Sequence, residues 1–404
     1  MLAPMQLDIG WRDLAVGALA CVYARGVDRR TQEVQSEWAS DGDAIACLSV
    51  RSGLDLYMSV LELPAGSEVL VSGLTIPDMP RILRHHGLVP IPVDLQIDTL
   101  GPNLEELRGA VSPRTRAILV AHLFGSRISM GPIVEFAAEH SLAVIEDCAQ
   151  AFTGDRFKGH PDSDIALFSF GVIKTATALG GGLVRVQDPR VRRRMQAQQQ
   201  AYPIQGRLAF LRRVQKAVLI KALMSRSLFT LLSTLWRWAG RDLDGVLHGV
   251  ARSFPGDRFF EMIRQRPSAP LLCLLKWRLR RCATTHTDRR STDGHDLAGR
   301  LAQNFEVPGG GAERHSYWVF PILSVEPDAD VSLARATGHY ATRRSSLAVV
   351  EPPQGASVAV PRECQRILDQ VVFVPVSPGG VTEGNARLSR GLVHESSVGD
   401  TPTD

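Results

Sequence analysis

Runs of apolar residues of strand length recur through the first half of the chain, and several are continuous rather than alternating. A continuous Val/Ile/Leu run is typical of a strand that is buried on both faces, as in a parallel sheet. The segments between the runs are amphipathic and long enough for crossover helices. This alternation predicts an α/β fold with a mostly parallel central sheet and helices on both faces. The predicted strands are 44–50, 68–71, 89–93, 116–123, 142–145, 165–170 and 182–186, and the predicted helices are 52–63, 77–86, 103–110 and 132–140.

The pattern changes after residue 187. A long helical and basic stretch follows to about residue 281, and a smaller α+β portion begins near residue 301, with predicted strands at 317–325 and 370–376. The last residues are polar and read as a frayed tail. We therefore predict four parts, which are a large domain at 1–187, a helical basic linker or insert at 188–300, a small C-terminal domain at 301–394 and a tail at 395–404.

The composition is that of a soluble globular protein, with 44% apolar and 22% charged residues among 404. The six cysteines show neither C-x-x-C nor C-x-x-H spacing, so we expect no metal site and no redox dithiol. No apolar run reaches the roughly 18 residues that a membrane span needs, and residues 1–10 lack the pattern of a signal peptide. These features predict a cytoplasmic protein.

The net charge of +4 hides a strong asymmetry. Between Arg190 and Arg241 there are twelve Lys/Arg and no Asp/Glu, which leaves 34 basic and 42 acidic residues elsewhere. Such a segment could face nucleic acid, an anionic membrane or a polyanionic ligand. No aromatic or glycine-rich alternation accompanies the charges, so we do not expect nucleic acid as a partner.

Within this basic segment, residues 217–238 alternate polar and apolar positions at helical spacing. The longest uncharged run, 227–236, is too short to cross a bilayer. Two interpretations stay open. The helix packs on the body or on a second subunit, or it makes a peripheral contact with an anionic inner-membrane surface, with Trp236 and Trp238 at headgroup level.

The first candidate for chemistry is the turn at Ser49–Leu54, which leads from a predicted buried strand into a helix. Ser52, with Asp55 three residues further on, fits a capping box. Free backbone N–H groups at such a helix start can bind a phosphate. The pattern also fits an ordinary capped helix with Arg51 facing solvent.

Two further candidates follow strands of the predicted sheet. Asp147 ends a buried apolar run, and ligands collect at the carboxyl ends of parallel strands. Lys174 lies just before the triple glycine Gly180–Gly182, which lets backbones approach closely. A lysine held partly out of water loses its proton more easily and can form a Schiff base. Taken singly, each residue also fits a structural role, as a helix-capping aspartate and a solvated loop lysine.

Several further segments accompany these candidates. They are Pro64–Val69, Pro92–Asp94, Ser112–Ile118, His122–Gly125, Ile145–Ala151 and Ser169–Lys174, followed near the C-terminus by His315–Pro321 and Val374–Pro378. In these segments, and in their spacing over about residues 49–187, the chain resembles fold-type I pyridoxal-phosphate enzymes, and specifically the DegT/DnrJ/EryC1/StrS family of sugar aminotransferases.

The resemblance implies a fold-type I PLP-transferase fold, with the helical basic insert and a small C-terminal α+β domain, and pyridoxal 5'-phosphate as the cofactor. It implies two catalytic residues. Lys174 would hold the cofactor as a Schiff base and carry the proton between the two carbons during transamination. Asp147 would pair with the pyridine nitrogen and keep it protonated, which makes the ring an electron sink.

The resemblance also implies the residues that bind the cofactor. Gln150 would form a hydrogen bond with the ring hydroxyl, and Ala149 would pack flat beneath the ring. Ser169 and the backbone at Arg51 and Ser52 would hold the phosphate.

The chain departs from the family pattern at four places. Arg51 stands in the usual Ser-Gly-Thr phosphate turn and adds charge there, while Ile76 stands where an aromatic residue is usual. The acidic residue of the glycine turn is missing from Leu179–Gly182. The family's Asn-Tyr-Arg-Met-Ser block, which reaches the partner subunit's cofactor, is matched only loosely by Arg264–Ser268.

For function, the resemblance implies a homodimeric aminotransferase that moves an amino group from glutamate or glutamine to a keto group of a nucleotide-activated sugar. Such reactions serve cell-surface polysaccharide or secondary-metabolite biosynthesis. Dehydratases of the family carry histidine in place of the lysine, so Lys174 argues against that branch. Three alternatives stay open. They are an aminotransferase for a cyclitol or another cyclic ketone, a lyase such as a cysteine desulfurase using Cys364 in a proline-flanked loop, and a non-catalytic PLP-fold protein.

Overall fold

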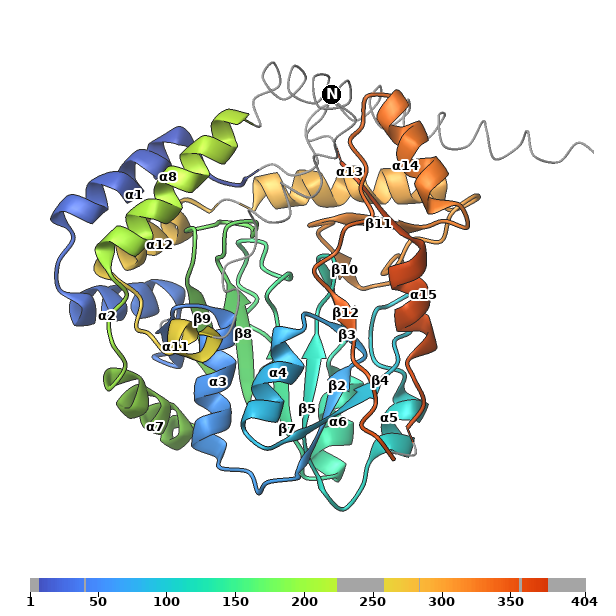
Figure 1. The fold of residues 1–404 in the computed structure, drawn as a ribbon, viewed down its shortest axis with the longest axis horizontal. Coiled ribbons are helices and arrows are strands. Elements are labelled where there is room, and N and C mark those ends of the chain that lie inside the picture. The colour runs from blue at the N-terminus through green and yellow to red at the C-terminus, as the bar shows by residue number, and fades with distance from the viewer. Residues whose placement is uncertain (1–6, 40, 224–257, 283, 356–357, 377–404) are drawn as a thin grey trace, which may run out of the picture.

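A computed structural model describes residues 7–39, 41–223, 258–282, 284–355 and 358–376 (Figure 1). Within these residues, seven strands form one central sheet. Strand β9 runs antiparallel to both of its neighbours, and every other pair in the sheet is parallel. The predicted mostly parallel sheet is therefore confirmed. In spatial order the strands are β1 (Ala44–Cys47), β9 (Gly182–Val186), β8 (Ile165–Ser169), β7 (Ala143–Asp147), β5 (Thr115–Ala121), β2 (Glu68–Ser72) and β4 (Val89–Val93).

Helices cover both faces of the sheet because its strands are apolar on both sides. On β2, Val69 and Val71 enter one core and Leu70 enters another, as the alternation of side chains along a strand requires. The first core is closed by α3 (Val50–Leu61), α4 (Asp78–His85), α7 (Pro189–Gln200) and α11 (Phe259–Ile263). The opposite face carries α5 (Leu104–Ala110) and α6 (Gly131–Glu139) at one end, and α2 (Val27–Trp38) and α12 (Ala269–Arg281) at the other.

Two more helices form an outer layer over α12. Helix α1 (Trp11–Tyr23) packs on α12 and on α8 (Arg207–Leu223), and Figure 1 shows α1 and α8 side by side. Gly17 permits this approach, since a Cβ there would lie 3.2 Å from Leu274 and 3.4 Å from Val214. The hydrophobic pattern predicted no element in residues 11–38, so α1 and α2 were found only in the structure.

The C-terminal part joins the sheet region through two short strand pairs. Strand β10 (Arg314–His315) pairs with β6 (Ser126–Arg127), and β12 (Ala348–Val349) pairs with β3 (Leu74–Thr75). The core of the C-terminal part lies around an antiparallel pair of strands, β11 (Phe320–Leu323) and β13 (Val371–Val374). This pair confirms the two strands predicted there. The remaining elements are α13 (Thr285–Leu301), α14 (Pro327–Ala336) and α15 (Arg362–Gln370).

Part of the predicted basic helix and the predicted tail lie outside the described residues. Helix α8 covers only residues 217–223 of the predicted 217–238, and Trp236, Trp238 and residues 395–404 belong to segments not described. Among the described residues, each helix is too short or too polar to cross a bilayer.

Candidate active site at the carboxyl edge of the sheet

Asp147 lies at the carboxyl end of β7, between β5 and β8, and its side chain is buried. One carboxylate oxygen accepts a hydrogen bond from the Ala149 backbone N–H at 3.0 Å. Burial raises the pKa of Asp147, and the opposing pulls of this hydrogen bond and of the charge on Lys174 are smaller. A buried carboxylate in this state is a site for a cationic group.

Lys174 lies in the turn after β8, where its backbone N–H bonds the Gly171 carbonyl oxygen at 3.0 Å. Its ammonium group stands 4.0 Å from the centre of the Trp318 ring. Burial lowers the pKa of Lys174 to about 8, although Asp147 acts in the opposite direction. This agrees with the expectation of a lysine held out of bulk water, and it gives an amine that is partly neutral near physiological pH.

The loop that carries Lys174 is held by residues from three distant segments. The Trp318 indole donates to the Ile173 carbonyl oxygen at 3.0 Å, and Asp8 accepts from the Ala176 N–H at 2.5 Å. Arg290 of α13 donates to the Ser316 carbonyl oxygen at 2.8 Å and reaches the Thr175 hydroxyl at 3.4 Å. The lysine is thus positioned by the N-terminal segment and by the C-terminal part together, which local sequence patterns do not reveal.

The helix start that was expected to bind phosphate is present, but its predicted capping box is wrong. The N-cap is Ser49, whose hydroxyl accepts from the Ser52 N–H at 3.2 Å. Because the helix begins at Val50, Ser52 already lies in the first turn and Asp55 in the second. Asp55 is instead buried beside α4 and α11, where it accepts two hydrogen bonds from Arg264 at 2.9 Å and lies 3.0 Å from His86.

Arg51 follows directly in this first turn and forms an ion pair with Asp78, at the start of α4. The positive charge of Arg51 is close enough to the centre of the site to contribute a lowering effect to the pKa of Asp147 and to that of Lys174. Arg51 is therefore a positive group at the expected phosphate position, with its guanidinium held by a carboxylate of the next helix.

The other predicted cofactor residues also lie at this sheet edge. Gln150 accepts from the Phe124 N–H at 2.8 Å through its amide oxygen. Ser169 ends β8 and accepts weakly from the Gly171 N–H at 3.4 Å. Ala149 follows Asp147 in the turn after β7. The structure thus brings the predicted residues of β7, β8 and α3 to one edge, while their roles toward a cofactor stay predictions.

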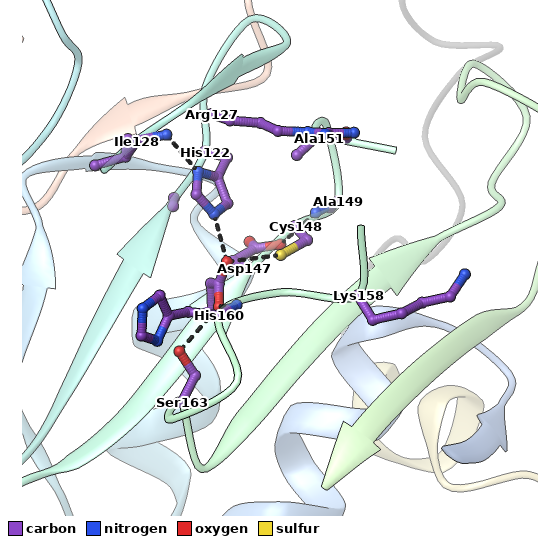
Figure 2. Close-up of polar contacts among 12 residues, drawn as sticks. His122, Arg127, Ile128, Asp147, Cys148, Ala149, Ala151, Lys158, His160 and Ser163 are labelled. Atoms are coloured by element: carbon purple, nitrogen blue, oxygen red, sulfur yellow. Dashed lines mark hydrogen bonds and ion pairs between the residues drawn. The ribbon is translucent and has the colours of Figure 1, made fainter. Parts of the chain in front are cut away.

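A buried network behind Asp147 was not found from the sequence (Figure 2). His122, which follows β5, lies with Nε2 at 2.8 Å from Glu146, while its Nδ1 accepts from the Ile128 N–H at 3.0 Å. The proton of the imidazole therefore sits on Nε2 and points at the carboxylate. The other Glu146 oxygen accepts from the His160 N–H at 2.7 Å and from the Ser163 hydroxyl at 2.9 Å.

Burial alone would raise the pKa of Glu146, but His122 and the other donors hold it at about 2. Glu146 is therefore ionised, and it fixes the strand from which Asp147 projects to the other side. The atoms of His122, Glu146 and Cys148 lie close enough to hold a metal ion, with mutual distances within 4.8 Å. Hydrogen bonds explain why these three side chains lie so close together, since the Cys148 thiol also donates to Glu146 at 3.4 Å.

Two other features noted in the sequence, the glycine turn and Cys364, can be placed in the structure. At Gly180, where φ is +156°, a Cβ would lie 2.6 Å from the Arg213 guanidinium of α8, so a basic side chain fills the space beside the turn that lacks its usual acidic residue. Cys364 is not in a loop but is buried in α15, and burial raises the pKa of its thiol. The predicted loop position of Cys364 is therefore wrong, and the alternative that needs a mobile nucleophilic cysteine is disfavoured.

Comparison with known proteins identifies the region that carries these residues. Residues 30–207 match the DegT/DnrJ/EryC1/StrS aminotransferase family. The resemblance inferred from the sequence motifs is thus confirmed for that region, which is less than half of the chain. GDP-perosamine synthase of Caulobacter vibrioides is 31% identical over 193 residues, covering 46% of this chain and 52% of that protein. The chain spans about half the length of the curated relatives it matches.

Solved structures match over nearly the whole chain at lower identity. The aminotransferase TlmJ from Streptoalloteichus hindustanus has a TM-score of 0.71 and 17% identity, covering 99% of this chain and all of that one. NtdA from Bacillus subtilis, solved with bound cofactor PMP, has a TM-score of 0.65 and 16% identity, covering 98% of this chain and 86% of that one. The chain therefore has the fold of these aminotransferases, as predicted.

Proposed function

We propose that the protein is a pyridoxal 5'-phosphate-dependent aminotransferase that transfers an amino group from glutamate or glutamine to a keto group of a nucleotide-activated sugar. The observation that carries this proposal is the buried pair of Asp147 and Lys174, in which the amine has a pKa of about 8 and the carboxylate attracts a cation. The match with a GDP-perosamine synthase supports the nucleotide-sugar class.

The described residues fit this cofactor. Asp147 is a buried carboxylate that accepts a hydrogen bond from the Ala149 backbone N–H, so a protonated ring nitrogen would supply the cation that burial demands. The start of α3 and Arg51 offer N–H groups and positive charge to a phosphate. The cofactor supplies an electron sink that stabilises a carbanion next to nitrogen.

Each predicted site residue would then have its own role toward the cofactor. Lys174 would attach the cofactor through its neutral amine and, once released, would accept and return the proton between the two carbons. Asp147 would keep the ring nitrogen protonated. Ala149 would support the ring from below, Gln150 would bond the ring hydroxyl, and Ser169 and the backbone at Arg51 and Ser52 would hold the phosphate.

Two alternatives remain within the same fold. The acceptor is a cyclitol or another cyclic ketone, or the protein keeps the fold without catalysis because Arg51 has altered the phosphate turn. The pair of Lys174 and Asp147 favours catalysis over the second alternative. A cysteine-based lyase reaction is disfavoured, since Cys364 is buried in α15.

The proposed activity is tested by half-reactions of the cofactor-loaded protein, followed by absorbance. Glutamate should change the absorbance of the bound cofactor, and a nucleotide-linked keto sugar should reverse that change. A free cyclic ketone that reverses it equally well would move the acceptor to the second class. A protein that binds the cofactor but responds to no amino donor would be a non-catalytic member of the fold.

We extend the proposal to organisation and location. A homodimer is the expected assembly, and the boundaries 1–187, 188–300 and 301–394 serve as working domains, although α8 and α12 share a core with α1 and α2. We place the protein in the cytoplasm, with peripheral contact at the inner membrane surface through the basic segment 190–241. Of that segment, the structure describes residues 190–223, which include α7 from Arg190 onward and all of α8.

A further inference from the structure

Exposed apolar side chains are concentrated on one part of the surface. Of the eleven large apolar residues that are exposed in the described part of the chain, eight lie on α1 and α8. These two helices lie side by side and contact each other (Figure 1). We call this the α1/α8 face, and its apolar members are Trp11, Leu19, Val22, Tyr23, Leu208, Val218, Leu219 and Leu223.

The face remains exposed after α8 has made its packing contacts. Phe210, Val214, Ala217 and Ile220 point inward and join the core shared with α1 and α12. The opposite side of the helix carries an outward stripe at helical spacing, formed by Leu208, Arg212, Gln215, Leu219 and Leu223. Packing on the body therefore accounts for one side of α8 and leaves a second apolar side in contact with water.

Charge on the α1/α8 face has one sign. The exposed basic residues are Arg12, Arg212 and Lys216, and the half-buried Lys221 stands 5.7 Å from the centre of the Trp11 ring. The single carboxylate on the two helices is Asp13, which is buried and paired with Arg278 at 2.6 Å. The surface thus combines exposed apolar side chains with positive charge and presents no carboxylate of its own.

We propose that the α1/α8 face docks on the surface of an anionic lipid bilayer. Two neighbouring helices that expose apolar side chains can bury Leu, Val and Trp side chains at the boundary of headgroups and acyl chains. Trp11 and Tyr23 carry the ring type that prefers this boundary. The basic residues approach anionic headgroups, each contributing about 1 kcal/mol.

A second copy of the chain fits this face less well. A two-fold dimer contact would press the same patch against itself. Arg12, Arg212 and Lys216 of one copy would then meet their counterparts without a carboxylate from either helix to neutralise them. An anionic surface has the complementary charge, so the proposal commits to lipid and makes self-association an outcome of the test.

Lipid docking through the α1/α8 face does not depend on the proposed chemistry. It also places the lipid contact on a different set of residues from those expected from the sequence. The sequence pattern placed it on 190–241 alone, whereas α1 contributes half of the apolar members. The first part of that segment, α7, packs on α3 and β9 instead. The N-terminal helix and α8 therefore act as one surface, although about 180 residues separate them.

The test is sedimentation of the full-length protein with vesicles of phosphatidylcholine alone or mixed with phosphatidylglycerol, at low and high salt. We expect binding to the mixed vesicles that weakens with salt. In the variant Arg212→Gln/Lys216→Gln, binding should fall about thirtyfold, since two contributions of about 1 kcal/mol are removed. The variant Leu19→Ser/Leu219→Ser should lose binding as well.

The matched control is Val325→Ser/Val360→Ser, which removes two exposed apolar residues away from the face. It should bind like the unchanged protein. Binding that is equal in all variants, or equal on neutral and anionic vesicles, would overturn the proposal. Absence of vesicle binding would overturn it too, and a mass that halves in Leu19→Ser/Leu219→Ser would assign the face to a second copy. Because Arg212 and Lys216 are exposed, the charge variant stays informative if the apolar variant fails to fold.

Discussion

Two regions of the molecule, the sheet edge around Asp147 and the α1/α8 face, place their charges and apolar groups in opposite ways. At the sheet edge the ionisable groups are withdrawn from water, and burial shifts the pKa of Asp147 upward and of Lys174 to about 8. On the α1/α8 face, apolar side chains and basic groups are both exposed. The first arrangement suits chemistry on a small molecule, and the second suits attraction to an extended surface.

The sharpest test of the buried region compares its lysine with a second lysine of similar pKa. Lys158 is half-buried over the Trp38 ring, 3.1 Å from the ring centre, and burial lowers its pKa to about 8 too. Figure 2 shows its side chain pointing away from the Asp147 cluster. Lys174→Ala should lower turnover about a thousandfold or more, because the group that transfers the proton is lost.

Lys158→Ala should leave turnover within about twofold of the unchanged protein and act on stability, since a desolvated cation–π contact contributes up to about 2 kcal/mol. Steady-state kinetics and thermal unfolding of both variants provide the two readouts. Equal losses of turnover would show that a lowered lysine pKa alone, rather than position beside Asp147, determines activity.

A smaller effect is expected at the carboxylate. Asp147→Asn removes the negative charge opposite the ring nitrogen and should slow the half-reaction with glutamate about a hundredfold, or about 3 kcal/mol. Cofactor affinity should change less than the rate. Rapid-mixing absorbance measures the rate and titration measures the affinity, and an unchanged half-reaction would remove Asp147 from its assigned role.

The two regions should also differ in their tolerance to substitution. A Cβ at Gly53 in α3 would lie 2.6 Å from Val184 and 3.3 Å from Leu167, so Gly53→Ala should reduce the free energy of unfolding by about 1 to 3 kcal/mol. Gly109 in α5 has open space around it, and Gly109→Ala should stabilise the protein by about 0.5 to 1 kcal/mol.

On the α1/α8 face, Leu219→Ser should change the free energy of unfolding by no more than about 0.5 kcal/mol, because its side chain is 59% exposed. Denaturant unfolding of Gly53→Ala and Leu219→Ser compares the two regions, and Gly109→Ala serves as a reference outside both. A large loss at Leu219 would mean that its side chain is covered in solution, which is the opposite of a free docking surface.

The sheet was predictable because its information is local. Strands buried on both faces need continuous apolar runs, and residues 117–121 and 142–145 have them, so β5 and β7 were found. Helices α1 and α2 were missed, since α1 mixes exposed and buried apolar residues and shows no clear stripe. The burial that fixes α1 comes from α8 and α12, which are distant in sequence.

The site was predictable in part. Asp147 and Lys174 end or follow buried strands, and their positions beside the family motifs made them candidates. The capping box failed because Ser49 caps the helix one turn earlier than Ser52, with its hydroxyl accepting from the Ser52 N–H. The role of Glu146 depends on His122 and Ser163 from other strands and loops, and pairing of this kind is set by tertiary structure.

The central claim is that Lys174 is the residue that attaches pyridoxal 5'-phosphate. The direct measurement is borohydride reduction of the protein after incubation with this cofactor, followed by mass mapping of its peptides. The account predicts one modified peptide, carrying the added mass on Lys174, with attachment that becomes faster as the pH rises through about 8 and the amine loses its proton. A protein that stays unmodified, or one that carries the label on Lys158 in place of Lys174, would contradict it.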